Sequence, residues 1–264
     1  MVGIVAFGSI CAMTFGLGCW QLQRYQWKVD LIEETRLRYE KQLVRLDPRN
    51  TVSTQAELHD YMMNIPGQRL SLCGTFAHDK EIKLGPRAAP PGLMGQAAQG
   101  MATNPQGFFL ITPFRLENDM IVFINRGWFP RHLDDNEISR PTGAICMTNL
   151  IVSTCEKKNT FTPIVDEKAL KSRTLLMADE ESLLKGTQLS QKLDKAILLE
   201  VVQPDNIALS LPYPVARRFQ QVSEPSVTPI THLTYAVTWY SLAAIGMFMT
   251  YKKFRSPKLR RNVR

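Results

Sequence analysis

The sequence lacks the short motifs by which many enzymes are identified. It contains no GxSxG, HExxH or GxxxxGK motif, and Gly16-Leu17-Gly18 lacks the third glycine of a dinucleotide-binding loop. Its five cysteines form no CxxC pair and its four histidines are scattered, whereas zinc and copper ligands come in close pairs. We therefore predict a protein that is not an enzyme and has no zinc or copper site.

No charged side chain interrupts two apolar runs, which lie at opposite ends of the sequence. The first covers residues 2–20 and the second residues 233–251, nineteen residues each. As a helix, either run would cover roughly 28 Å, close to the hydrocarbon thickness of a bilayer. We predict two transmembrane helices, with both termini on one side of a membrane and the central region on the other.

Acidic residues are absent from the tail at residues 252–264, which holds seven Lys and Arg. Positively charged flanks stay in the bacterial cytoplasm or the mitochondrial matrix, so the central region should face the periplasm or the intermembrane space. Without those seven charges the formal net charge of +8 falls to about +1. This balance argues against a nucleic-acid-binding domain, and the bilayer itself is the partner we expect for the tail.

The first run also lacks the marks of a cleaved signal peptide. No basic residue precedes it, and it ends in Cys19-Trp20-Gln21 rather than in small residues. We interpret it as an uncleaved anchor. A presequence rich in Arg and Ser is not seen before it, so we expect either that the chain begins late or that import relies on internal signals.

The central region shows the alternation of polar and apolar residues that is typical of strands. We expect strands at residues 68–76, 81–84, 108–116, 120–125, 144–154 and 196–202. Helices are expected at residues 27–44, 55–62 and 179–185, with a long loop at 88–106 and a stiff connector at 204–229. Because no βαβ alternation occurs, we predict an antiparallel, barrel-like sheet with a few helices, and hence an α+β membrane protein.

The central region contains three cysteines, Cys73, Cys146 and Cys155, whereas Cys11 and Cys19 lie in the first run. A disulfide between Cys146 and Cys155 would require an oxidising compartment. We favour two small buried thiols for this pair.

Two segments contain candidate binding residues. In Asn125-Arg126-Gly127-Trp128-Phe129-Pro130, Gly127 permits an unusual backbone angle and Trp128 can cover the core. Arg126 would then present its guanidinium at the edge of the domain, although a structural salt bridge is the favoured interpretation for this Arg taken alone.

The second segment begins at His232, beside the second apolar run. Tyr235, Ala236 and Trp239 follow at i+3, i+4 and i+7 and so share its helical face. An imidazole beside a flat aromatic surface can coordinate haem iron. Ordinary anchoring at the membrane interface is the competing interpretation, and the residues alone favour it. Cys19 and Met13 are conceivable second iron ligands.

The first apolar run has a small residue at every fourth position, namely Gly8, Ala12 and Gly16. Such a stripe allows close approach of another helix. We expect it to pack against the second run, and a helix of a client protein is the alternative.

Taken in order, several segments resemble the Surfeit locus protein 1 family of cytochrome c oxidase assembly factors over nearly the whole chain. The matching pieces are Gly18-Cys19-Trp20-Gln21 with Arg24 and Lys28, Arg69 with Gly74-Thr75-Phe76, Gly85-Pro86-Arg87, Thr112-Pro113-Phe114, Asn125–Pro130, and His232-Leu233 with Tyr235-Ala236 and Thr238-Trp239-Tyr240. One position differs, because the family tends to have Asn before the histidine and this chain has Thr231.

The resemblance implies a non-enzymatic protein that helps to mature the large catalytic subunit of cytochrome c oxidase, together with other assembly factors. Family members lie in the mitochondrial inner membrane or the bacterial plasma membrane. Some bacterial members bind haem a, and the histidine matching His232 is implicated. Haem propionates would need cations, for which Arg24, Arg69, Arg87 and Arg126 are candidates.

We therefore predict a multi-pass protein of the mitochondrial inner membrane. Its parts are a transmembrane helix at residues 1–20, an intermembrane-space domain at 21–231, a second transmembrane helix at 232–251 and a matrix tail at 252–264. The predicted site has His232 as the haem a iron ligand, with Tyr235, Trp239 and Arg126 also binding the haem. The alternatives are a scaffold that binds no haem, a membrane-tethered enzyme, and a bacterial rather than organellar source.

Overall fold

The computed structural model describes residues 2–47, 51–90, 93, 105–158, 167–205, 212–223 and 228–255. The chain divides into two compact units. The helical unit consists of Met1–Glu34 and Glu224–Arg264, and the sheet unit is Thr35–Ser223. Each unit is described by itself.

Two long helices form the helical unit, α1 (Val2–Glu40), whose last residues belong to the sheet unit, and α7 (Pro229–Arg255). By length and composition, the described ranges contain one helix able to cross a membrane, Gly3–Glu40. The first predicted span and the helix predicted at residues 27–44 are thus parts of one continuous helix. The structure does not establish α7 as a second span, because Thr, Tyr, Trp and Ser lie between its apolar residues and lower its hydropathy.

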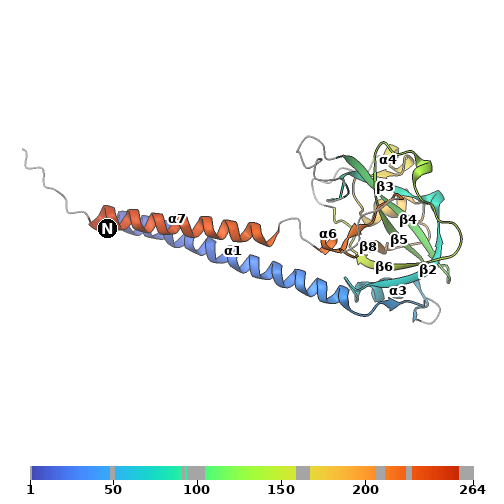
Figure 1. Ribbon diagram of the computed structural model, residues 1–264, viewed down its shortest axis with the longest axis horizontal. Coiled ribbons are helices and arrows are strands. Elements are labelled where there is room, and N and C mark those ends of the chain that lie inside the picture. The colour runs from blue at the N-terminus through green and yellow to red at the C-terminus, as the bar shows by residue number, and fades with distance from the viewer. Residues whose placement is uncertain are drawn as a thin grey trace, which may run out of the picture. The chain divides into compact units, whose positions relative to one another are not determined.

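The sheet unit combines a mixed sheet with short helices (Figure 1). Its strands are β1 (Val44–Arg45), β2 (Leu70–Phe76), β3 (Ile82–Ala88), β4 (Gln106–Leu116), β5 (Ile121–Pro130), β6 (Ile145–Ser153), β7 (Thr174–Leu175), β8 (Leu198–Gln203) and β9 (Arg217–Arg218). Its helices are α3 (Gln55–Met63), η1 (His78–Lys80), η3 (Asp135–Glu137), α4 (Glu167–Lys171), α5 (Glu180–Gly186) and α6 (Phe219–Ser223).

The sheet closes on itself. The strand order runs β1-β2-β6-β8-β5-β4-β3-β7, and β2 also pairs with β4, so β2, β6, β8, β5 and β4 form a ring. A closed ring leaves no unpaired edge among these strands. The predicted α+β architecture with a barrel-like sheet is confirmed. The prediction of a purely antiparallel sheet is wrong, because β5 pairs with β8 in parallel, as do three two-residue strands with their neighbours.

The core lies against this ring. Phe114, Leu150 and Leu199 are fully buried and come from three strands of the ring. α3 adds Leu58 and Met62 to the same cluster, because these residues are four apart and share one helical face. A second cluster forms where α5 packs against β3 and β4.

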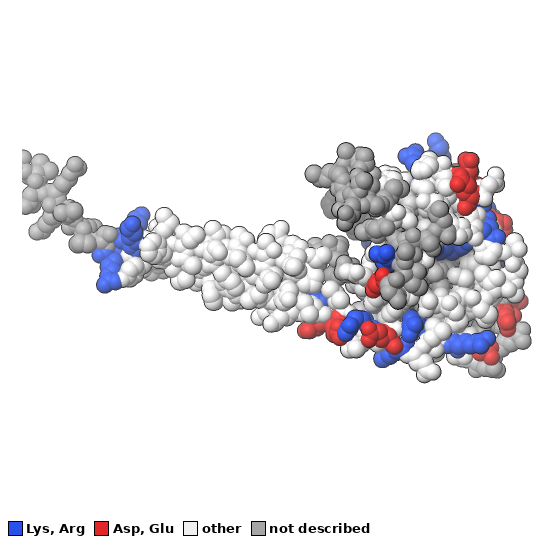
Figure 2. All heavy atoms as spheres, in the orientation of Figure 1, with Lys and Arg blue, Asp and Glu red and all other residues white. Residues whose placement is uncertain are grey.

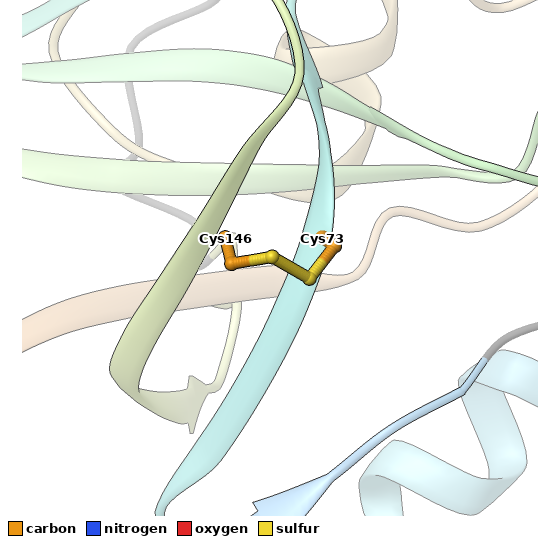
Figure 3. The surroundings of a disulfide bond; sticks show 2 residues. All are labelled: Cys73 and Cys146. Atoms are coloured by element: carbon orange, nitrogen blue, oxygen red, sulfur yellow. A yellow bond between two sulfur atoms is a disulfide. The ribbon is translucent and has the colours of Figure 1, made fainter.

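A disulfide joins Cys73 on β2 to Cys146 on β6 (Figure 3). The two residues are direct partners in the antiparallel pairing of these strands. The expectation of a Cys146 thiol, and the alternative Cys146–Cys155 bond, are therefore both wrong. Cys155 is a free thiol, and its burial together with the nearby charge of Glu180 raises its pKa to about 11. A thiol in that state is protonated and poorly reactive at neutral pH.

Candidate functional site

His232 lies in the first turns of α7 and faces α1 within the helical unit. Its ring nitrogen Nδ1 is 2.7 Å from the amide oxygen Oε1 of Gln21 on α1. An amide oxygen can only accept a hydrogen bond, so this contact places the ring hydrogen on Nδ1. The other nitrogen, Nε2, then keeps its lone pair, and no described residue hydrogen-bonds to it. A metal ion binds the imidazole through such a nitrogen.

Positive charge lies beside this imidazole. Arg24 and Lys28 follow Gln21 by three and seven residues, so all three share one face of α1. The charges of Lys28 and Arg24 both act on His232. The Arg24 guanidinium also lies 4.4 Å from the centroid of the Trp27 ring. The site therefore combines a metal-binding nitrogen with cations that can pair with carboxylates.

The residues predicted to share a helical face with His232 differ in their exposure in the structure. Ala236 is buried and Trp239 is half-buried, whereas Tyr235 is 52% exposed on the outer side of the helix. The helical spacing that predicts a shared face is present, but the neighbouring α1 covers part of that face. Tyr235 remains open to a ligand or to lipid.

The structure does not bring the conceivable second iron ligands to His232. The Tyr240 hydroxyl donates a hydrogen bond to Cys19 Sγ at 3.3 Å, and Tyr240 lies eight residues after His232. Eight residues of helix correspond to about 12 Å. Met13 lies eight residues before Gln21 and is 72% exposed. The sulfur of Cys19 is thus engaged by Tyr240, and Met13 lies about two helical turns along α1 from Gln21.

Arg126 does not present its guanidinium at the domain edge, which corrects that prediction. Its side chain is 7% exposed, and Nη1 donates to Glu81 Oε1 at 3.2 Å, while Nη2 donates to the carbonyl oxygen of Ser139. Leu110 pairs with Gly127 and Ile111 with Asn125, so Arg126 is the extra residue of a β-bulge. Burial lowers its pKa, an effect that the charge of Glu81 opposes. The salt bridge that the sequence favoured for Arg126 alone is present.

Glu81 also binds other groups in this cluster. Its Oε2 accepts from Arg140 Nε at 2.9 Å, and its Oε1 lies 2.7 Å from His78 Nδ1. The Thr112 hydroxyl lies 3.3 Å from the same Oε1. These partners of the Glu81 carboxylate all belong to the sheet unit, so the cluster stabilises the bulge and the strands around it.

The other candidate arginines of the sheet unit have structural partners as well. Arg69 donates to the carbonyl oxygens of Tyr39 and Lys41 at 2.8 and 3.3 Å. Arg87 donates to Glu156 and to the carbonyl oxygen of Leu176 at 3.0 and 3.1 Å. Of the four arginines proposed for propionates, Arg24 is the one that shares a unit with His232.

The small-residue stripe of α1 does not pack on α7, contrary to expectation. The close contacts between these helices involve Gly18 with the Tyr240 ring, and Gly246 with Cys11 Sγ. Nothing lies within 4 Å of the position that a Cβ would occupy at Gly8 or Gly16. Gly8 and Ala12 instead line an apolar groove of about 620 Å³ beside the helix pair. The face of α1 that contacts α7 contains Cys11 and Gly18, which are seven residues apart. This face differs from the one that carries Gly8, Ala12 and Gly16.

Within the described parts of the chain, no group of three or more His, Cys, Asp and Glu residues is arranged to hold a metal ion. A metal ion at His232 would therefore have a single protein ligand among the described residues. Gln21 is the residue of this site that sequence reasoning missed. Its only signal was its place in the matching segment Gly18-Cys19-Trp20-Gln21.

Comparison with known proteins places the chain in a family. The model of the SURF1 family matches residues 9–244. A SURF1-like protein of Drosophila melanogaster is 31% identical over 251 residues, covering 92% of this chain and 75% of the fly protein. Surfeit locus protein 1 of Homo sapiens is 26% identical over 244 residues, covering 91% of this chain and 73% of the human protein. The chain belongs to the SURF1 family.

Proposed function

We propose that this protein is a membrane-anchored assembly factor for cytochrome c oxidase, which presents haem a to the large catalytic subunit of that enzyme through His232. Membership of the family supports the link to the oxidase. The observation that carries the haem part is the state of His232, whose Nδ1 is held by Gln21 while no described residue bonds Nε2. We propose no enzymatic step for the protein.

The residues of the helical unit suit the ligand. Haem a, when bound, would supply an iron that accepts a nitrogen ligand, together with two propionate carboxylates. His232 Nε2 is the nitrogen that would bind that iron, and Arg24 is the cation that would pair with a propionate. Tyr235 offers an exposed ring on the same helix. Arg126 takes no part, because its guanidinium is buried against Glu81.

We propose that α7 is a second transmembrane helix beside α1. Its last turn contains Lys252, Lys253 and Arg255, and Figure 2 shows basic side chains gathered at that end of the helix pair, next to a stretch without charged side chains on the visible face. Positive flanks favour the matrix side. The disulfide between Cys73 and Cys146 supports a sheet unit in an oxidising compartment. Animal and plant relatives favour the mitochondrial inner membrane, with the sheet unit in the intermembrane space.

Spectroscopy of the full chain, purified in detergent with haem a supplied, tests this function. We expect a Soret band that is lost in His232→Ala and kept in His132→Ala, because His132 is an exposed residue of the sheet unit. The oxidase catalytic subunit should co-purify with the wild-type protein. Co-purification without pigment, unchanged by His232→Ala, would replace the haem function with that of a scaffold. If the wild-type protein neither binds haem a nor co-purifies with the oxidase subunit, the proposal is refuted.

A further inference from the structure

We propose that Gln21 is a positioning residue, which fixes His232 in the tautomer that can bind a metal. The significance of this role for haem a depends on the proposed function, but the tautomer itself does not. Gln21 comes from α1 and His232 from α7, 211 positions later, so folding of the helical unit alone brings them together.

The chemistry of the contact determines the tautomer. A neutral imidazole carries one hydrogen, on either Nδ1 or Nε2. Oε1 of Gln21 lies 2.7 Å from Nδ1, and because this oxygen has no hydrogen to give, Nδ1 must be the donor. Nε2 is then the nitrogen with a free lone pair, and it is the only ring position that can coordinate iron. The opposite amide orientation would place a hydrogen on Nε2 and block coordination.

The surrounding charges favour the amide orientation that the structure has. Arg24 and Lys28 lie on the same face of α1 as Gln21, and both charges reach the His232 ring. The oxygen end of an amide is its negative end, so cations nearby stabilise an oxygen rather than an NH₂ group directed into this site. The Gln21 amide thereby fixes the tautomer and the ring orientation of His232, as a carboxylate or carbonyl oxygen does for metal-binding histidines in general.

The orienting contact comes from the other helix and not from the residue next to His232 in sequence. Thr231, which precedes His232, has its hydroxyl 3.1 Å from that of Thr228. The tautomer therefore depends on correct packing of α1 against α7.

The tautomer can be measured without any haem. In the full chain labelled with ¹⁵N-histidine, at a pH where the ring is neutral, His232 signals are assigned by their loss in His232→Ala. We expect a pyrrole-type Nδ1 and a pyridine-type Nε2 in the wild type. Gln21→Leu keeps the volume but removes the acceptor, so it should shift the ring toward the Nε2–H form. Gln21→Glu, a stronger acceptor, should retain the Nδ1–H form.

Gln23→Leu is the matched control, because Gln23 is an exposed glutamine two positions along α1. It should leave the tautomer unchanged. An Nε2–H tautomer in the wild type, or a tautomer balance that Gln21→Leu does not alter, would overturn the inference. If Gln21→Leu fails to fold, retention of Nδ1–H in Gln21→Glu supports the inference and its loss refutes it.

Haem a is the second probe. Loss of an orienting partner typically weakens metal binding about 10- to 100-fold, so Gln21→Leu should weaken haem a binding by that factor, and Gln21→Glu should not. A lower iron–histidine stretching frequency in Gln21→Leu would mark the loss of the hydrogen bond. If the wild type binds no haem a, the proposed function fails, and the tautomer measurement still decides the role of Gln21.

Discussion

Glu81 is the residue on which the buried charges of the sheet unit depend. Its carboxylate is 9% exposed and lies within hydrogen-bond distance of Arg126, Arg140 and His78. Each of these residues is distant in sequence or on another element, so one carboxylate joins η1, β5 and the segment after η3. Removing the charge of Glu81 would destabilise the protein mainly by leaving Arg126 buried without its partner. The Arg140 side chain is 31% exposed, so water can solvate its charge instead.

Glu81→Gln should destabilise the protein by about 3–5 kcal/mol, the cost typical of leaving a buried charge without its partner. Glu137→Gln, at an exposed position of η3, is the control and should change stability by less than about 0.5 kcal/mol. Urea unfolding of the detergent-solubilised chain measures both, with tryptophan fluorescence as the signal, to which the fully buried Trp128 contributes. Equal midpoints for the two variants would contradict a stabilising role of the pair between Glu81 and Arg126.

At the scale of elements, the bulge in β5 positions both the Arg126 side chain and the backbone of Trp128. Arg126 is the extra residue, and Gly127 has a φ of 130°, a region that residues with a Cβ rarely adopt. After this turn, Trp128 exchanges two backbone hydrogen bonds with Val215, each of 2.8 Å. A Cβ at position 127 would overlap the carbonyl oxygen of Val215. The glycine is therefore what allows residues 213–215 to close against β5.

Gly127→Ala should cost about 2–4 kcal/mol, since it adds a steric overlap to an unfavourable backbone angle. Gly143→Ala is a matched control: Gly143 has a φ of 82° but nothing within 4 Å of a Cβ, so it should cost only about 1 kcal/mol. Hydrogen exchange at the amides of Trp128 and Val215 should accelerate in the first variant alone. Similar losses of stability in both would show that the backbone angle, and not the close approach, dominates.

Sequence patterns predict those strands and turns whose formation depends on residues close together in sequence. Alternation predicts β2, β4, β6 and β8, and the Glu117-Asn118-Asp119 turn predicts the pairing of β4 with β5, because a hairpin joins neighbours in sequence. β1, β7 and β9 have two residues each, too few for any alternation to register. The parallel pairing of β5 with β8 joins strands about 75 positions apart, for which no local signal exists. The loop expected at residues 88–106 and the tail lie largely outside the described residues.

The candidate site likewise contains residues that local sequence predicts and residues that depend on distant parts of the chain. His232 and its helical neighbours follow from spacing along one helix. Gln21 does not, since it comes from the other end of the chain, and a glutamine near a membrane interface has no distinctive pattern of its own. Arg126 looks like an edge residue in sequence because nothing there reveals Glu81, 45 positions away. The Cys73–Cys146 bond was missed for the same reason, since its partners are 73 residues apart.

At the scale of the whole molecule, the proposed arrangement in the membrane depends on whether α7 crosses the bilayer. The sequence after it holds seven basic residues between positions 252 and 264. Each positive charge is favoured on the negative side of an energised membrane by about 2.3 kcal/mol per 100 mV. A tail of this kind is therefore strongly held in the matrix, provided that the helix before it can span.

Epitope tags at the two ends of the chain test this directly in mitoplasts treated with protease. With two spans, both tags are protected and the sheet unit is digested, because α1 and α7 return the chain to its starting side. With α1 alone as an anchor, the C-terminal tag is digested together with the sheet unit and the N-terminal tag survives. Detergent should expose both tags and serves as the control. The absence of charged residues from α7 before Lys252 and the basic residues in its last turn are the observations on which the expected two-span result depends.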